Sequence, residues 1–130
     1  MIVQNAERDS TLGTAIEVAA TAAKRARGLL GREALAAGEG LLFKHCSSLH
    51  TFFMRFPIDI VYADKDGRVL KIATAVPPFR MCMAPRRSFY ALELPAGSLV
   101  GTNTHVKDVL RFVEEYELEE APPKPAEAAA

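Results

Sequence analysis

Cys46 and His50 are the residues whose types and spacing most directly suggest chemistry. A thiol beside an imidazole can act as a nucleophile, and Cys-x3-His is half of a zinc-binding spacing. The two residues would lie about 6 Å apart on one helical turn but about 13 Å apart in an extended chain. A zinc site needs about four ligands, and only His45, Cys82 and His105 could complete this one. The interpretation we favour is a buried apolar cysteine and a histidine that ends a core-facing stripe.

Two carboxylates interrupt apolar strand patterns. Asp59 would be costly in such a strand unless it is paired or hydrogen-bonded, so a raised pKa and a role as general base are one reading. We favour a structural role, in which Asp59 pairs with Arg27 or Arg55 or accepts bonds from backbone amides. Glu93 is most simply explained as solvent-exposed on an alternating strand. Paired-carboxylate chemistry would require Glu93 and Asp59 to face one pocket.

Three arginines lie in an irregular segment, Val76–Ser88, that is also rich in proline. Arg80, Arg86 and Arg87 could bind a phosphate or a carboxylate, because guanidinium groups recognise such anions through paired hydrogen bonds. Long loops in small domains are often functional. The alternative is an ordinary solvated surface, which we favour.

The segment His50–Phe56 alternates, so that His50, Phe52 and Met54 would share one face of a strand. Aromatic residues on both faces predict a central strand that is covered on both sides. This stripe is the predicted wall of a ligand site.

Turn signals divide the rest of the chain into short strands. Asp64–Gly67 predicts a hairpin between strands at 58–63 and 68–74, because Asp-Gly suits the positive φ of such turns. Further strands are expected at 15–20, 40–43, 89–94 and 99–103, and helical turns at 22–30 and 32–37. Residues 107–116 fit either a helix or a strand.

Composition limits the class of protein. The 130 residues are 49% hydrophobic and carry no formal net charge, which gives no overall attraction to nucleic acid or to an anionic membrane. No secretion signal and no run of about 18 apolar residues is present. The sequence therefore predicts a soluble cytoplasmic protein with reduced thiols, and no cofactor is expected apart from the zinc alternative.

These patterns predict a mainly β domain, with α+β as the alternative. The architecture expected is a small β-barrel or sandwich with one or two short N-terminal helices. Residues 1–13 are expected to form a flexible arm, residues 14–116 a single globular domain, and residues 117–130 a disordered acidic, Pro- and Ala-rich tail.

Five segments, in this order, resemble domain-of-unknown-function family 192: Arg27–Arg32, Gly38–Phe43, Phe53–Ile60, Asp66–Val69 and Ala91–Gly97. The resemblance implies a compact, mainly β fold and no established activity. Family members usually carry a Gly-Asp pair near the last strand, where this chain has Lys107-Asp108. The resemblance also favours a strand over residues 107–114.

Three functional hypotheses follow. The first is a non-catalytic domain that binds a small ligand, such as an anion, between the His50 stripe and the Val76–Ser88 loop. The second is a metal or thiol-dependent enzyme site built on Cys46, His50 and Asp59. The third is a module that binds a protein partner through an edge strand or the tail.

Overall fold

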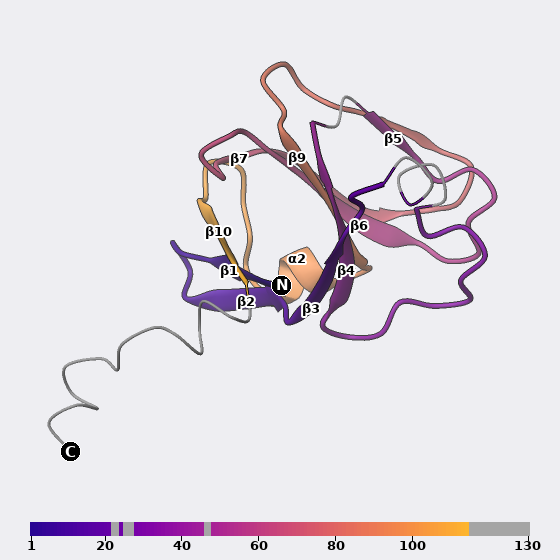
Figure 1. Ribbon diagram of the computed structural model, residues 1–130, viewed down its shortest axis with the longest axis horizontal. Coiled ribbons are helices and arrows are strands. Elements are labelled where there is room, and N and C mark those ends of the chain that lie inside the picture. The colour runs from indigo at the N-terminus through magenta and orange to yellow at the C-terminus, as the bar shows by residue number, and fades with distance from the viewer. Residues whose placement is uncertain (22–23, 25–27, 46–47, 115–130) are drawn as a thin grey trace, which may run out of the picture.

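The computed structural model describes residues 1–21, 24, 28–45 and 48–114, and it is mainly β (Figure 1). A five-stranded sheet consists, in spatial order, of β3 (Ala15–Val18), β4 (Glu39–Lys44), β9 (Tyr90–Pro95), β6 (Ile58–Ala63) and β7 (Val69–Val76). A three-stranded sheet consists of β10 (Leu110–Val113), β1 (Ile2–Asn5) and β2 (Ser10–Gly13). The remaining elements are a two-stranded ribbon, β5 (Ser48–His50) with β8 (Met81–Met83), and the short helix α2 (Ser98–Gly101).

These elements form layers on the five-stranded sheet. One face packs against the three-stranded sheet and α2, through a core that includes Val3, Leu92 and Leu99. The other face packs against the ribbon and neighbouring loops, through a core that includes Tyr62 and Cys82. Over the described residues the sheets stay open, so the arrangement agrees with the predicted sandwich rather than with a closed barrel.

The central strands were predicted well. β6 is buried at all six positions and begins directly after Pro57, as expected of a strand covered on both faces. β6 and β7 form the predicted hairpin, in which Oδ1 of Asp64 accepts bonds from the amides of Asp66 and Arg68. Gly67 has a φ of 85°, a conformation that favours glycine.

The N-terminal arm was predicted wrongly. Residues 2–5 and 10–13 form β1 and β2, which pair with each other, and β1 also pairs with β10. Val3 is fully buried and Leu12 nearly so. These short strands contain few apolar residues, and β1 is stabilised by a partner more than 100 residues away. The ambiguous segment 107–116 contributes that partner, the strand β10, as the resemblance implied.

Three other local predictions were wrong. The alternating strand His50–Phe56 ends at His50, and the following residues form turns. Residues 99–103 overlap the helix α2 instead of forming a strand, and Arg32–Ala37 is not helical. The helix expected over residues 22–30 and the C-terminal tail fall largely or wholly outside the described residues.

Candidate functional site

The β5–β8 ribbon is fixed to the sheet by one tyrosine. The Tyr62 hydroxyl accepts a bond from the Leu49 amide, 3.0 Å, and donates to the Cys82 carbonyl, 2.7 Å. Leu49 and Cys82 are register partners on β5 and β8, so a single hydroxyl binds both strands. The inner face of the ribbon therefore points into the core, while His50, Met81 and Met83 alternate onto the outer face.

The outer face of the ribbon and the adjoining turns expose a group of large apolar side chains. Among the described residues, five of the seven exposed large hydrophobic side chains lie here. We call them the aromatic surface: Phe52, Phe53, Phe79, Met81 and Met83. His50 joins them, because its ring stacks on Phe52 at 5.1 Å and its backbone pairs with Met81.

Two of these rings sit on unfavourable backbone. Phe53 has a φ of 64° and Phe79 a φ of 62°, although bulky residues rarely adopt the left-handed region. The rings meet edge to face with centroids 5.7 Å apart. Their exposed fractions are 75% and 58%, so burial does not offset the backbone cost. Strain of this kind persists where surrounding structure imposes it, and it is common at functional sites.

Thr51 holds the backbone of Phe53 and Phe79 in this conformation through its hydrogen bonds. It is fully buried, and its amide donates to the Arg80 carbonyl while its carbonyl accepts from the Phe79 amide. Its hydroxyl donates to the Pro77 carbonyl, 2.7 Å, and accepts from the Arg80 amide, 2.9 Å. Thr51 thus joins the turn that carries Phe53 to the turn that carries Phe79.

The stretches of sequence that form the aromatic surface carry only positively charged residues. Residues 48–58 and 77–88 contain Arg55, Arg80, Arg86 and Arg87 but no Asp or Glu. All four arginines are exposed. Arg55 lies 3.7 Å from Glu33, but both side chains are so exposed that this pair contributes little.

The predicted ligand stripe is not one surface. His50 and Phe52 are exposed, whereas Met54 is buried in the core at 6% exposure. Alternation predicted one shared face, but the chain turns after His50, so that His50 and Phe52 stack on the outside while Met54 enters the core. Arg80 adjoins β8, while Arg86 and Arg87 lie in the turn that follows it.

Asp59 has the structural role that the sequence favoured. It is fully buried, and its carboxylate accepts bonds from the amides of Ala75, Gly97 and Leu99 at 2.8, 3.1 and 2.9 Å. Of the predicted alternatives, backbone amides are therefore its partners among the described residues. Asp59 ties β7 and the start of α2 to the centre of the sheet.

Glu93 is buried, although the sequence predicted that it would be exposed. Its strand β9 lies between β4 and β6, and a hydrophobic core covers each face of the sheet. The exposed fraction of Glu93 is 4%, and burial raises its pKa to about 8. No hydrogen bond or ion pair joins its carboxyl to the other described residues.

Glu93 and Asp59 do not share a pocket. Glu93 pairs in register with Ile60, and Asp59 with Leu94. Since paired residues of antiparallel strands share a face and neighbours alternate, the two carboxyls point to opposite faces of the sheet. The paired-carboxylate chemistry considered from the sequence is therefore contradicted by the register.

The structure describes only some of the residues on which the thiol and metal hypothesis depends. Cys46 lies outside the described residues, whereas Cys82 is a buried free thiol. His50 is exposed, and its Nδ1 accepts a bond from the Phe52 amide. The described residues contain no group of three or more His, Cys, Asp and Glu side chains that could hold a metal. The zinc alternative stays a prediction.

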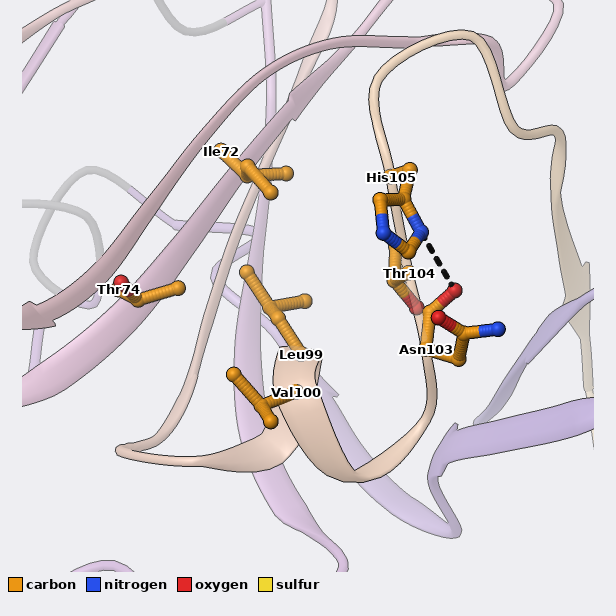
Figure 2. Close-up of a pocket in the computed structure, with 7 residues that line it drawn as sticks. All are labelled: Ile72, Thr74, Leu99, Val100, Asn103, Thr104 and His105. Carbon is orange, nitrogen blue, oxygen red and sulfur yellow. Dashed lines mark hydrogen bonds between the residues drawn. The ribbon is translucent and has the colours of Figure 1, made fainter.

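A cavity that the sequence did not indicate lies beside β7 (Figure 2). Its volume is about 200 Å³, and it is lined by Ile72, Thr74, Leu99, Val100, Asn103, Thr104 and His105. His105 entered the sequence analysis only as a spare zinc ligand. No local motif marks this cavity, because its residues come together only when α2 packs against the sheet.

The comparison with known families settles the resemblance. Residues 3–112 match domain-of-unknown-function family 192, described as an uncharacterised ACR. The chain belongs to this family. Two family 192 segments far apart in sequence meet in the fold, because a Cβ placed on Gly28 would lie 3.9 Å from Oε1 of Glu93.

Solved structures support the family 192 fold. A protein of unknown function from Novosphingobium aromaticivorans has a TM-score of 0.72 and 23% identity, over 85% of this chain and 82% of that one. A candidate transcription regulator from Sinorhizobium meliloti has a TM-score of 0.69 and 23% identity, over 85% and 89%. At this identity both similarities concern the fold alone. No functionally curated protein matches the chain.

Among the described residues of this family 192 member, no helix is long and apolar enough to cross a bilayer. The cytoplasmic location and the absence of a nucleic-acid partner stay predictions from the sequence.

Proposed function

We propose that this domain is a non-catalytic binding module whose aromatic surface holds an acidic, partly apolar segment of a partner protein. The observation that carries this proposal is the pair of exposed rings, Phe53 and Phe79, on left-handed backbone. A strained backbone that only exposes apolar rings to water has no stabilising role. Contact with a partner supplies the burial that the rings lack in the isolated chain.

The composition of the aromatic surface fits a protein interface. Aromatic residues, methionine and arginine are enriched in such interfaces, and a few buried aromatic anchors carry most of the binding energy. The flexible side chains of Met81 and Met83 adapt to varied partner shapes. The rings protrude from turns, whereas small-molecule sites are usually concave and enclose most of the ligand.

The arginines near the aromatic surface favour an acidic segment of the partner. Arg55 and Arg80 follow the exposed rings in sequence, and residues 48–58 and 77–88 carry no acidic residue, although Arg55 also lies 3.7 Å from Glu33. Arginines beside an apolar surface attract and orient acidic partners and repel basic ones. A segment that alternates glutamate or aspartate with leucine or phenylalanine would match both properties.

The small anionic ligand suggested by the sequence is the alternative occupant. Such a ligand would need Arg80, Arg86 and Arg87 but not the phenylalanines. Replacing the phenylalanines therefore separates the two ideas.

Fluorescence anisotropy with three labelled probe peptides tests the proposal. The first peptide contains Glu, Leu and Phe, the second has Lys in place of Glu, and the third has Ser in place of Leu and Phe. We expect the first peptide to bind and the other two to bind at least about tenfold more weakly. The second lacks the acidic charges, and the third lacks the apolar side chains. The double variant Phe53→Ser, Phe79→Ser should also lose at least about tenfold.

The matched control is Val106→Ser, which replaces another exposed apolar side chain outside the aromatic surface. It should bind the acidic peptide like the unaltered domain. Equal binding of all three peptides, or binding that survives loss of both phenylalanines, would contradict the proposal. Binding to phosphatidylserine vesicles without binding to the acidic peptide would replace it with a membrane role.

A further inference from the structure

The cavity of Figure 2 lies between β7 and the segment that follows α2. Its volume of about 200 Å³ exceeds the roughly 150 Å³ that can hold a benzene molecule. It uses none of the residues of the aromatic surface. The cavity therefore has room for one ring-sized organic molecule at a separate place on the domain.

One side of the cavity is aliphatic. Figure 2 shows Ile72, Leu99 and Val100 on the side opposite His105. Leu99 is 1% exposed and belongs to the core, whereas Val100 is 77% exposed and stands at the rim. A molecule in the cavity would shield exposed surface of Ile72 and Val100 from water, and would touch the small part of Leu99 that reaches the cavity.

The other side presents a hydrogen-bond acceptor. Nδ1 of His105 lies 3.0 Å from the backbone carbonyl oxygen of Asn103. Because a carbonyl oxygen can only accept, Nδ1 must carry the proton, and in the neutral ring Nε2 then has a free lone pair. In Figure 2 this second nitrogen lies on the edge of the ring that faces Ile72 and Leu99.

The backbone holds His105 in place. Asn103 adopts a left-handed φ of 55°, and the Thr104 amide closes the end of α2 by donating to the Leu99 carbonyl. The His105 amide donates to the carboxylate of Asp108, 2.9 Å. That carboxylate is in turn bound by Asn5 and Arg8. A histidine fixed in this way loses little freedom when a ligand binds.

We propose that this cavity binds a small neutral molecule of the phenol class, with its hydroxyl donating to Nε2 of His105 and its ring against Leu99 and Ile72. The chemistry follows from the two walls. The aliphatic wall favours an apolar ring, and the lone pair favours a donor on that ring.

The test uses 4-methylphenol and toluene as probes, followed by NMR of isoleucine, leucine and valine methyl groups. We expect saturable shifts at Ile72, Leu99 and Val100 with 4-methylphenol. His105→Phe should weaken 4-methylphenol by about three- to tenfold, the usual worth of one hydrogen bond, and leave toluene unchanged. His45→Phe, at another exposed histidine, is the matched control and should change neither probe.

A second variant keeps the test informative if His105→Phe perturbs the loop. Val100→Trp places a large side chain at the exposed rim and should abolish binding of both probes. Absence of saturable shifts at about 5 mM 4-methylphenol, enough to detect a Kd near 1 mM, would overturn the proposal. Equal affinity for toluene and 4-methylphenol would overturn it as well, because the histidine would then contribute nothing.

Discussion

Thr51 and Arg80 exchange two hydrogen bonds across the turns of the aromatic surface. The Thr51 amide donates to the Arg80 carbonyl at 2.8 Å, and the Arg80 amide donates to the Thr51 hydroxyl at 2.9 Å. A threonine that is entirely buried thereby sets the spacing of two exposed phenylalanines. The two turns are held from the inside by the backbone and hydroxyl bonds of Thr51, and the rings of Phe53 and Phe79 meet edge to face on the outside.

Thr51→Val should destabilise the domain by about 2 kcal/mol, because it leaves the Arg80 amide and the Pro77 carbonyl without their hydroxyl partner. Urea unfolding measures the change. Thr11→Val, at an exposed strand position, is the control and should stay within about 0.5 kcal/mol of the unaltered domain. An equally small effect at Thr51 would show that the turns hold together without it.

Phe53→Asn should leave stability nearly unchanged. Asparagine tolerates the left-handed backbone, so relief of about 1–2 kcal/mol of strain offsets the lost contact with Phe79, worth about 0.5–1.5 kcal/mol. Phe112→Asn, at a half-buried ring on β10, should instead cost about 2 kcal/mol or more. Thermal unfolding of both variants decides the matter. A comparable loss at Phe53 would mean that its ring supports the fold.

Glu93 should make stability fall as pH rises. Its pKa is raised from 4.5 to about 8 in the folded state, so between these values the folded chain retains a proton that the unfolded chain has released. Stability is then full below about pH 4.5 and declines towards pH 8, by about 1 kcal/mol per pH unit. Denaturant unfolding across this range should show a slope that Glu93→Gln removes.

Glu17→Gln is the control for that slope, because Glu17 is an exposed strand residue. It should leave the pH dependence intact. Asp108, whose pKa is lowered to about 2 by hydrogen bonds from Asn5 and Arg8, affects the stability of the domain in a different pH range. Its contribution is lost only as pH falls below about 4. A slope that persists in Glu93→Gln would assign the effect to another group.

Lys107→Gly should stabilise the domain. Lys107 has a φ of 82°, a left-handed conformation that favours glycine. Removing the side chain relieves about 1–2 kcal/mol of backbone strain and adds about 0.5–1 kcal/mol of unfolded-state entropy. The net gain of about 0.5–1 kcal/mol should be visible in urea unfolding. Lys71→Gly, within β7, should be destabilising.

The sequence predicted those parts of the fold that local patterns determine. The hairpin at Asp64–Gly67 has its turn chemistry within four residues, and the apolar runs of β6 and β9 are long enough to mark strands. The alternation of His50–Phe56 predicted a strand where the chain forms turns, because a turn can show the same alternating spacing by chance. Pairing of β1 with β10 depends on residues at opposite ends of the chain and leaves no local pattern.

The candidate site was predicted only in part. Asp59 was expected to be satisfied structurally, which its three backbone donors confirm. Glu93 was expected in solvent, because an alternating strand does not reveal that sheets or loops cover both of its faces. The strain at Phe53 and Phe79 depends on bonds from Thr51, and aromatic residues otherwise suggest a core.

The most direct test of the aromatic surface is NMR of methionine methyl groups during titration with the acidic Glu, Leu and Phe peptide. The chain has four methionines, of which Met81 and Met83 are exposed on the surface and Met54 is buried in the core. We predict saturable shifts of Met81 and Met83, while Met1 and Met54 stay in place. Unchanged Met81 and Met83 signals, or equal shifts of all four, would contradict the proposed binding site.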